Sequence, residues 1–297
     1  MSTHTTVVTR TKNRPLLLRR ALCSVLGQTQ ENWTHVVVND GGDPAPVESL
    51  GSEYAAKYDG RLKIIHNERS LGMEAASNIG IAQSDSDYIL IHDDDDSLHT
   101  CFLEKTMAYI DNPPYPSIHG VATLAVRVEE IVQGNVVSKV SEKPFRTLSG
   151  CLSAAQIADA NQIPPISFVF RREAYKAVGP FDESLPVMGD WEFLLRFIAK
   201  FDIGVISEAL ANYHLRTGDA GTMTNSIGDR SNNFALYEGV IRNRMFRHEE
   251  YSPALAALLQ QGNATQRIRS LYRHPVIGGF IRLWSKFIDS NIPPTPY

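Results

Sequence analysis

The chain has 297 residues, with 29 Lys and Arg against 33 Asp and Glu and a formal net charge of -4 at pH 7. This length can bury a substantial core, and the near balance of charges gives no global signal for nucleic-acid binding. Three scattered cysteines without metal-ligand spacing indicate buried reduced thiols rather than a disulfide framework. The sequence shows neither the apolar stretch of a secretory signal nor a segment apolar enough to span a bilayer. We therefore expect a cytoplasmic protein.

The N-terminal part of the sequence predicts an α/β fold. Short runs rich in Val and Ile occur at residues 5–9, 34–39, 62–66 and 88–92, and helix-like stretches separate them. This alternation is typical of a mostly parallel, doubly wound sheet that is covered on both faces. The clearest helix begins at Pro15 and ends at Gly27. In such sheets ligands bind beyond the carboxyl ends of the strands.

The pattern changes after residue 111. Two extended segments, 119–128 and 132–140, flank a plausible hairpin turn around Gly134, and a further apolar strand is predicted at 166–170. Helices are predicted at 172–178 and 191–201 and from about residue 228 to the end. We expect one domain over residues 1–227, with halves at 1–111 and 112–227, and a helical C-terminal extension over 228–297.

The extension includes an amphipathic helix from Pro275 to Asp289, with Arg267, Arg269 and Arg273 just upstream. A wide apolar face next to basic residues suits an interfacial membrane helix. Such a face is more often buried against the same domain or another subunit. Peripheral contact with the inner face of the membrane and a homo-oligomer through these helices therefore both stay open.

Four consecutive aspartates, Asp93 to Asp96, directly follow an apolar strand. Like charges at a sheet edge raise one another's pKa unless a cation or strong donors neutralise them. An acidic stretch is more often a solvated loop. The spacing from Asp93 to Glu104 also matches a calcium loop, but Leu98 stands where that loop needs Gly. Because the tract starts abruptly after a buried strand, we expect a site for a hard divalent metal.

Several segments together resemble the family 2 glycosyltransferases of the GT-A fold. The stretch from Val7 to Pro15 is similar to the family's opening strand and Thr-Tyr-Asn-Arg turn, with Lys12 in place of Tyr. Residues 39–42 are similar to its Asp-Asp-Gly-Ser segment, 72–82 to its Gly-rich helix, and 93–96 to its Asp-x-Asp signature. Residues 179–182 and 189–193 are similar to its second half, where Gly189 replaces a Glu. The ordered set is far more specific than any one motif.

This resemblance implies a GT-A type nucleotide-binding fold and a metal-dependent, inverting glycosyltransferase. The donor would be a UDP-, GDP- or dTDP-sugar, and the acceptor a glycan, a glycolipid or a small hydroxyl compound, as in polysaccharide synthesis. Residues 1–111 would form the nucleotide-sugar-binding half and residues 112–227 the acceptor-binding half. No nucleic-acid partner is expected.

The resemblance also implies roles for particular residues. Donor-binding positions would be Thr11, Lys12, Arg14, Asp40, Gly72, Asn78, Asp93 and Asp94, with Asp40 on the base and Asp94 facing the sugar or ribose. Asp93 and Asp95 alternate in an extended segment and can share one Mn²⁺ or Mg²⁺, which His214 would approach from the second half. The alternative for His214 is a structural histidine at a strand end.

Asp190 would be the base that deprotonates the acceptor hydroxyl. It also suits a helix N-cap, and both roles can coexist.

Two other functions stay open. A nucleotidyltransferase would normally carry a Gly-rich phosphate loop after the first strand, but residues 10–14 contain no Gly. A non-catalytic nucleotide- or carbohydrate-binding module stays open because Gly189 replaces the Glu.

Overall fold

The computed structural model describes residues 3–134, 136–216, 223 and 231–247. The first part alternates strands and helices: β1 (Thr5–Thr11), α1 (Pro15–Leu26), β2 (Trp33–Asp40), α2 (Pro44–Tyr58), β3 (Leu62–Asn67), α3 (Met73–Ile81) and β4 (Tyr88–Asp93). Next come β5 (Ser97–Leu98), α4 (Phe102–Asp111), β6 (Ile118–Gln133), β7 (Val136–Pro144), α5 (Ala154–Asp159) and the short 3-10 helix η1 (Pro165–Ser167). The last described elements are β8 (Phe168–Arg171), α6 (Arg172–Val178), α7 (Gly189–Ile198), β9 (Asp202–Arg216) and α8 (Ser231–Arg247).

The strands form one nine-stranded sheet in the order β3-β2-β1-β4-β8-β6-β9-β5, and β7 pairs with β6 outside this path. Strands β3, β2, β1 and β4 are mutually parallel. Strand β8 runs antiparallel to both β4 and β6, whereas β6 and β9 are parallel. The predicted α/β fold with a mostly parallel sheet is therefore confirmed for its first half, and the second half adds antiparallel strands.

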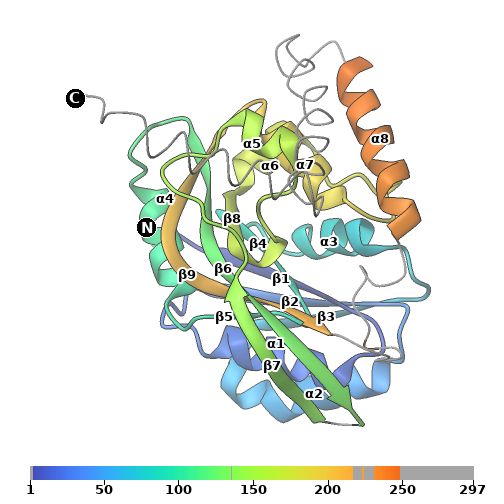
Figure 1. Ribbon diagram of the computed structural model, residues 1–297. Coiled ribbons are helices and arrows are strands. Elements are labelled where there is room, and N and C mark those ends of the chain that lie inside the picture. The colour runs from blue at the N-terminus through green and yellow to red at the C-terminus, as the bar shows by residue number, and fades with distance from the viewer. Residues whose placement is uncertain (1–2, 135, 217–222, 224–230, 248–297) are drawn as a thin grey trace.

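Helices cover both faces of the sheet, with α3, α6 and α7 on one side and α1 and α2 on the other (Figure 1). Side chains alternate between the faces along each strand. Val8, Val38 and Ile91 pack in a core with α3 and α7, and Val7, Val37 and Leu90 pack in a second core with α1, α2 and α4. The continuous apolar runs of these strands reflect burial on both faces.

The predicted hairpin is present, with β6 and β7 antiparallel on either side of the turn at Gly134. The fifteen-residue strand β9 was not anticipated over its length, because Glu208 and other polar side chains interrupt its apolar pattern. Its pairing with β6, rather than its own periodicity, makes it a strand.

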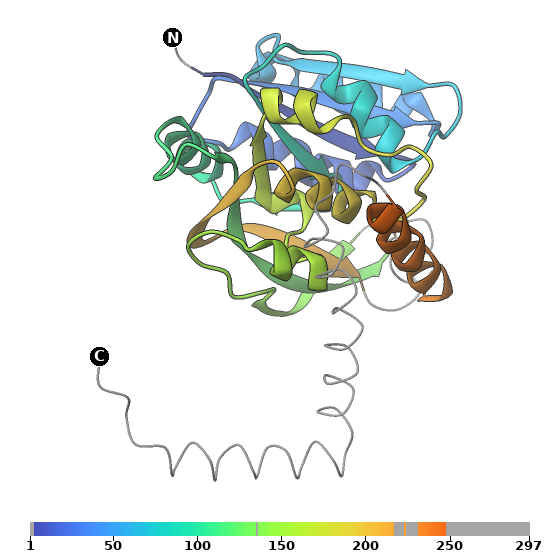
Figure 2. The ribbon, with the colours of Figure 1, turned by 90° about the horizontal axis from the view of Figure 1, so that it is seen from above.

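Helix α8 packs beside α5 and α7 (Figure 2). Arg242 of α8 lies 4.9 Å from the Trp191 ring centroid and donates a 2.9 Å hydrogen bond to the Ala158 carbonyl. Within the described ranges, no helix has the length and apolarity needed to cross a membrane. The predicted amphipathic helix Pro275 to Asp289 lies outside the described residues, and the proposed division at residue 227 stays a prediction.

Candidate functional site

The aspartate tract lies at the carboxyl end of β4, beside the carboxyl end of β1. The parallel register of the two strands places Arg10 opposite Asp93. The chain then turns, because the main-chain N–H of Asp96 donates a 3.1 Å hydrogen bond to the Asp93 carbonyl. The expected extended alternation of the tract is therefore wrong. A turn brings Asp96 to the same side as Asp93 and Asp95, which strict alternation would have excluded.

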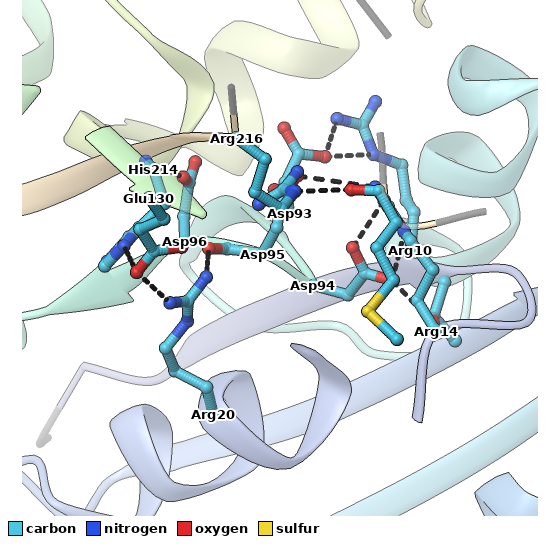
Figure 3. Close-up of polar contacts among 12 residues, drawn as sticks. Arg10, Arg14, Arg20, Asp93, Asp94, Asp95, Asp96, Glu130, His214 and Arg216 are labelled. Atoms are coloured by element: carbon cyan, nitrogen blue, oxygen red, sulfur yellow. Dashed lines mark hydrogen bonds and ion pairs between the residues drawn. The ribbon is translucent and has the colours of Figure 1, made fainter. Parts of the chain in front are cut away.

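Arginines from distant segments hold three of the four carboxylates (Figure 3). Arg10 pairs with Asp93, and Arg216 at the end of β9 pairs with Asp95. Arg14 lies 2.5 Å from Asp94 and 3.4 Å from Asp95. The Thr11 hydroxyl also donates a 2.6 Å hydrogen bond to Asp94. The predicted donor-binding residues Thr11 and Arg14 thus reach the aspartate tract, while Lys12 is exposed.

Asp96 is completely buried and only partly satisfied. One carboxylate oxygen accepts a 2.8 Å hydrogen bond from the main-chain N–H of His214. The other oxygen is buried and has no hydrogen-bond partner among the residues that the structure describes. A buried carboxylate oxygen in this state is costly unless a cation or donor reaches it. Burial accordingly raises the pKa of Asp96 well above its usual range.

Asp93, Asp95 and Asp96 can each present an oxygen within 4.8 Å of the others. Carboxylate oxygens are the ligands that Mg²⁺ and similar hard cations prefer. The Asp96 oxygen without a hydrogen-bond partner is a second feature that a bound cation would satisfy. The residues present therefore fit a divalent cation.

The arginines give the neighbouring carboxylates different proton affinities. Burial raises the pKa of Asp94 to about 7, although Arg14 opposes the shift. For Asp95, burial is outweighed by Arg14 and Arg216, which lower its pKa. Of Asp94, Asp95 and Asp96, Asp95 is therefore the carboxylate that stays ionised most readily, which suits a metal ligand.

His214 meets the tract through its backbone rather than its ring. Its Nδ1 lies 2.7 Å from a Glu130 carboxylate oxygen and its Nε2 lies 2.9 Å from the Ser97 hydroxyl. Arg20 completes this cluster, because it contacts Glu130 at 2.7 Å and donates to the Asp95 carbonyl. Both ring nitrogens of His214 therefore have protein partners. The predicted metal-ligand role of His214 stays a prediction, and the ligand set that we propose from the geometry contains Asp96 in its place.

Asp40 fastens a loop at the end of β2. Its carboxylate accepts hydrogen bonds from the Ser70 hydroxyl at 2.8 Å, the Asn67 amide at 2.9 Å, and the main-chain N–H groups of Leu71 at 2.8 Å and Gly72 at 3.0 Å. Burial would raise the pKa of Asp40, but these hydrogen bonds lower it. Its predicted contact with a nucleotide base is untested, and the geometry shows a structural role for Asp40 and for the Gly72 N–H.

Asn78 joins the two halves of the domain. Its amide nitrogen donates 2.9 Å hydrogen bonds to the Phe181 carbonyl and to Glu183, and its oxygen accepts from the Phe181 N–H and the Tyr175 hydroxyl at 3.0 Å. These bonds use the donors and acceptor of the amide within the protein. We therefore leave Asn78 out of the proposed donor site.

Asp190 is the second residue of α7, so the N-cap interpretation is wrong: Met188 holds that position. The Asp190 carboxylate accepts a 2.8 Å hydrogen bond from the Trp191 N–H and a 2.7 Å hydrogen bond from the Asn161 amide. Burial raises its pKa, which these hydrogen bonds and Arg10 oppose. A carboxylate with a raised pKa suits a general base. Trp191 is buried in the core.

The sequence interpretation missed several charged residues of this site: Arg10, Arg20, Glu74, Glu130 and Arg216. Only Arg10 carried a usable signal, because it ends the first strand and the parallel neighbour of that strand ends in the aspartate tract. The others reach the site from a helix face or a distant strand, which spacing along the chain does not reveal.

Comparison with known proteins identifies the domain. Residues 6–130 match the model of glycosyl transferase family 2. Residues 6–130 therefore carry a glycosyl transferase family 2 domain. Its curated relatives include the pre-mycofactocin glycosyltransferase of Mycobacterium tuberculosis, which is 28% identical over 201 residues. That match covers 65% of this chain and 38% of the relative. The uncharacterized glycosyltransferase YwdF of Bacillus subtilis is 28% identical over 197 residues, covering 64% of this chain and 66% of the relative.

Solved structures show that this family 2 domain has the GT-A fold. TarS 1-349 from S. aureus in complex with UDP-GlcNAc aligns with a TM-score of 0.63 and 18% identity, covering 88% of this chain and 73% of that one. The mannosyltransferase PcManGT from Pyrobaculum calidifontis, in complex with GDP-Man and Mn²⁺, aligns with a TM-score of 0.60 and 12% identity. That alignment covers 97% of this chain and 81% of the mannosyltransferase.

Proposed function

We propose that this chain is a metal-dependent, inverting glycosyltransferase that moves a sugar from a nucleotide-sugar donor to an acceptor hydroxyl. The observation that carries the proposal is the convergence of Asp93, Asp95 and Asp96, with one unsatisfied buried oxygen, at the carboxyl ends of β1 and β4. Ligands of open α/β sheets bind at this edge. The family match and the nucleotide sugars bound by structural neighbours support the same conclusion.

Departure of the nucleotide leaves negative charge on a diphosphate. A divalent cation held by Asp93, Asp95 and Asp96 would supply Lewis-acid stabilisation of that charge. Arg14 and Arg216 both contact the Oδ2 atom of Asp95 and would fix the orientation of this carboxylate when it holds the ion. Their guanidinium groups also add positive charge beside the leaving group.

The acceptor side of the reaction belongs to Asp190. Its carboxylate would accept the proton of the acceptor hydroxyl as that oxygen attacks the anomeric carbon, and a single displacement inverts the configuration. Asn161 and the Trp191 N–H hold the carboxylate in place through hydrogen bonds of 2.7 and 2.8 Å. Burial raises the pKa of Asp190 above its usual value, which makes the carboxylate a stronger base.

The finer parts of the proposal rest on the sequence resemblance. They are a UDP-, GDP- or dTDP-sugar donor, Mn²⁺ or Mg²⁺ as the ion, and a glycan, glycolipid or small hydroxyl acceptor in polysaccharide or glycoconjugate synthesis. We also propose a cytoplasmic site of action, with the amphipathic segment 275–289 as a contact for the inner membrane face or for a second copy of the chain.

Titration calorimetry tests the metal site. UDP-GlcNAc and GDP-mannose are titrated into the full chain with and without Mn²⁺, and Mn²⁺ should tighten binding of the preferred donor by about tenfold or more, equivalent to about 1.4 kcal/mol. Asp95→Asn and Asp96→Asn should lose this gain, because each replaces a carboxylate ligand by a neutral amide. Asp85→Asn, at an exposed carboxylate outside the cluster, should keep it. Donor binding that ignores Mn²⁺ in the wild type would refute the proposed metal site.

A further inference from the structure

A buried glutamate that the proposed mechanism does not use lies between the donor and acceptor sides of the site. Glu74 belongs to α3 and is only 3% exposed. One of its oxygens lies 3.5 Å from the Arg10 guanidinium and makes no hydrogen bond within the described part of the chain. Burial raises the pKa of Glu74 to about 8. A buried carboxyl group left this incompletely bonded is costly, so a role beyond packing is expected.

The Glu74 carboxyl group fills the space that a side chain at position 189 would need. A Cβ built on Gly189 would lie 2.4 Å from one Glu74 carboxyl oxygen and 2.5 Å from the carboxyl carbon. Real side chains do not tolerate such contacts, so a side chain at position 189 would displace the Glu74 carboxyl group from this place. Position 189 is also where the motif comparison found Gly in place of Glu. A carboxyl group is therefore present at this point, but it comes from α3.

Glu74 links the two sides of the site through Arg10. Arg10 pairs with Asp93 at the end of β4, and Glu74 of α3 approaches the same guanidinium group. Glu74 also rests on the first residue of α7, directly before Asp190. The pocket among Arg10, Glu74 and Asp190 has aromatic walls and room for about one water molecule, so solvent screens these groups little.

We propose that Glu74 is a positioning residue, which supplies from α3 the carboxyl group that a glutamate at position 189 would otherwise supply, and which holds Arg10 and the first turn of α7 in register. The inference rests on the proposed function, because it gives Glu74 its effect through Asp93 and Asp190. It differs from that function in assigning the control of acceptor-side geometry to a helix of the donor half.

A carboxyl-swap experiment tests the proposal in the full chain. Glu74→Ala should lower kcat for UDP release from UDP-GlcNAc, or for GDP release from GDP-mannose, by about 10- to 100-fold, because small displacements at a reacting centre have effects of this size. The KM for the donor should stay within about threefold of the wild type. Adding Gly189→Glu to Glu74→Ala should restore kcat to within about tenfold of the wild type, since the space is then free for the new side chain.

Glu192→Ala is the matched control, because Glu192 is a buried carboxylate of α7 that pairs with Arg196 at 2.7 Å. It should lower the melting temperature and leave kcat within about threefold of the wild type. If Glu74→Ala does not fold, Gly189→Ala replaces it, because the added Cβ displaces the Glu74 carboxyl group and should lower kcat by about tenfold.

The results separate this proposal from the proposed function. Unchanged kcat in folded Glu74→Ala, or in Gly189→Ala, overturns the positioning role while the enzyme stays an active transferase. A loss of kcat that the double variant does not recover overturns the carboxyl swap. A wild-type protein without turnover on any nucleotide sugar refutes the proposed function, and the role of Glu74 fails with it.

Discussion

Replacement of Asp190 by Asn separates its structural contacts from its proposed chemistry. The carboxylate accepts one hydrogen bond from the Trp191 N–H and one from the Asn161 amide. An asparagine side chain at this position can keep the first with its oxygen, but its amide nitrogen then faces the donor group of Asn161. Loss of one buried hydrogen bond costs about 1 kcal/mol, which lowers the melting temperature by about 2–4 °C in a protein of this size.

The expected loss of activity is much larger. A general base contributes a factor of about 10² to 10⁴, and an amide cannot take over the proton transfer. A stability reserve of about 5–15 kcal/mol is reduced by only about 1 kcal/mol, so nearly all molecules stay folded at 25 °C. Reduced folding therefore cannot account for a hundredfold loss of turnover.

The assay measures nucleotide release with Mn²⁺ over a range of pH, next to a thermal-shift measurement. In the wild type, kcat/KM should fall on the acidic side at a pH above the usual aspartate range, because burial raises the pKa of Asp190. Asp182→Asn, at a half-buried carboxylate that pairs with Arg244, serves as the control and should stay active. If Asp190→Asn turns over at more than about a tenth of the wild-type rate, the general-base assignment is refuted.

Two further predictions concern stability. Gly80→Ala should lower the free energy of unfolding by about 1–3 kcal/mol in urea titrations, because the new Cβ would lie 2.3 Å from a Val8 methyl group. Gly239→Ala in α8 is the control and should raise the free energy of unfolding by up to about 1 kcal/mol, because no atom lies within 4 Å of its new Cβ. Equal effects of the two substitutions would contradict the packing argument. Burial lowers the pKa of His35 well below 6.5, so as the pH falls the unfolded chain binds a proton at His35 before the folded protein does. The free energy of unfolding that His35 contributes above pH 6.5 is therefore lost as the pH falls, by up to about 1.4 kcal/mol per pH unit. His35→Gln should have a flatter dependence between pH 6.5 and 5, and parallel curves for the two proteins would show that His35 is not buried in its neutral form.

Local patterns of the sequence were sufficient to predict helices that have one apolar face and ordinary terminal residues. Helix α1 begins at Pro15 and is followed by Gly27, and α6 covers Arg172–Val178, as their apolar spacing and terminal residues indicate. Helix α7 begins at Gly189 rather than Trp191, because Met188 adopts the left-handed conformation and starts the helix without a side-chain cap. No propensity of the residues around it signals such a start.

The sequence by itself determined the alternation of strands and helices, the sheet edge at which the tract Asp93 to Asp96 lies, and the ordered motifs that place the domain in its family. These properties depend on neighbouring residues, whose periodicity and order are written along the chain. Only the tertiary structure decided which carboxylates share a site. A turn places Asp96 beside Asp93 and Asp95, and arginines at the ends of β1 and β9 form ion pairs with Asp93 and Asp95. Only the tertiary structure showed that the Glu74 carboxyl group occupies the space next to Gly189. A sequence records separation along the chain and says little about which distant side chains occupy the same volume.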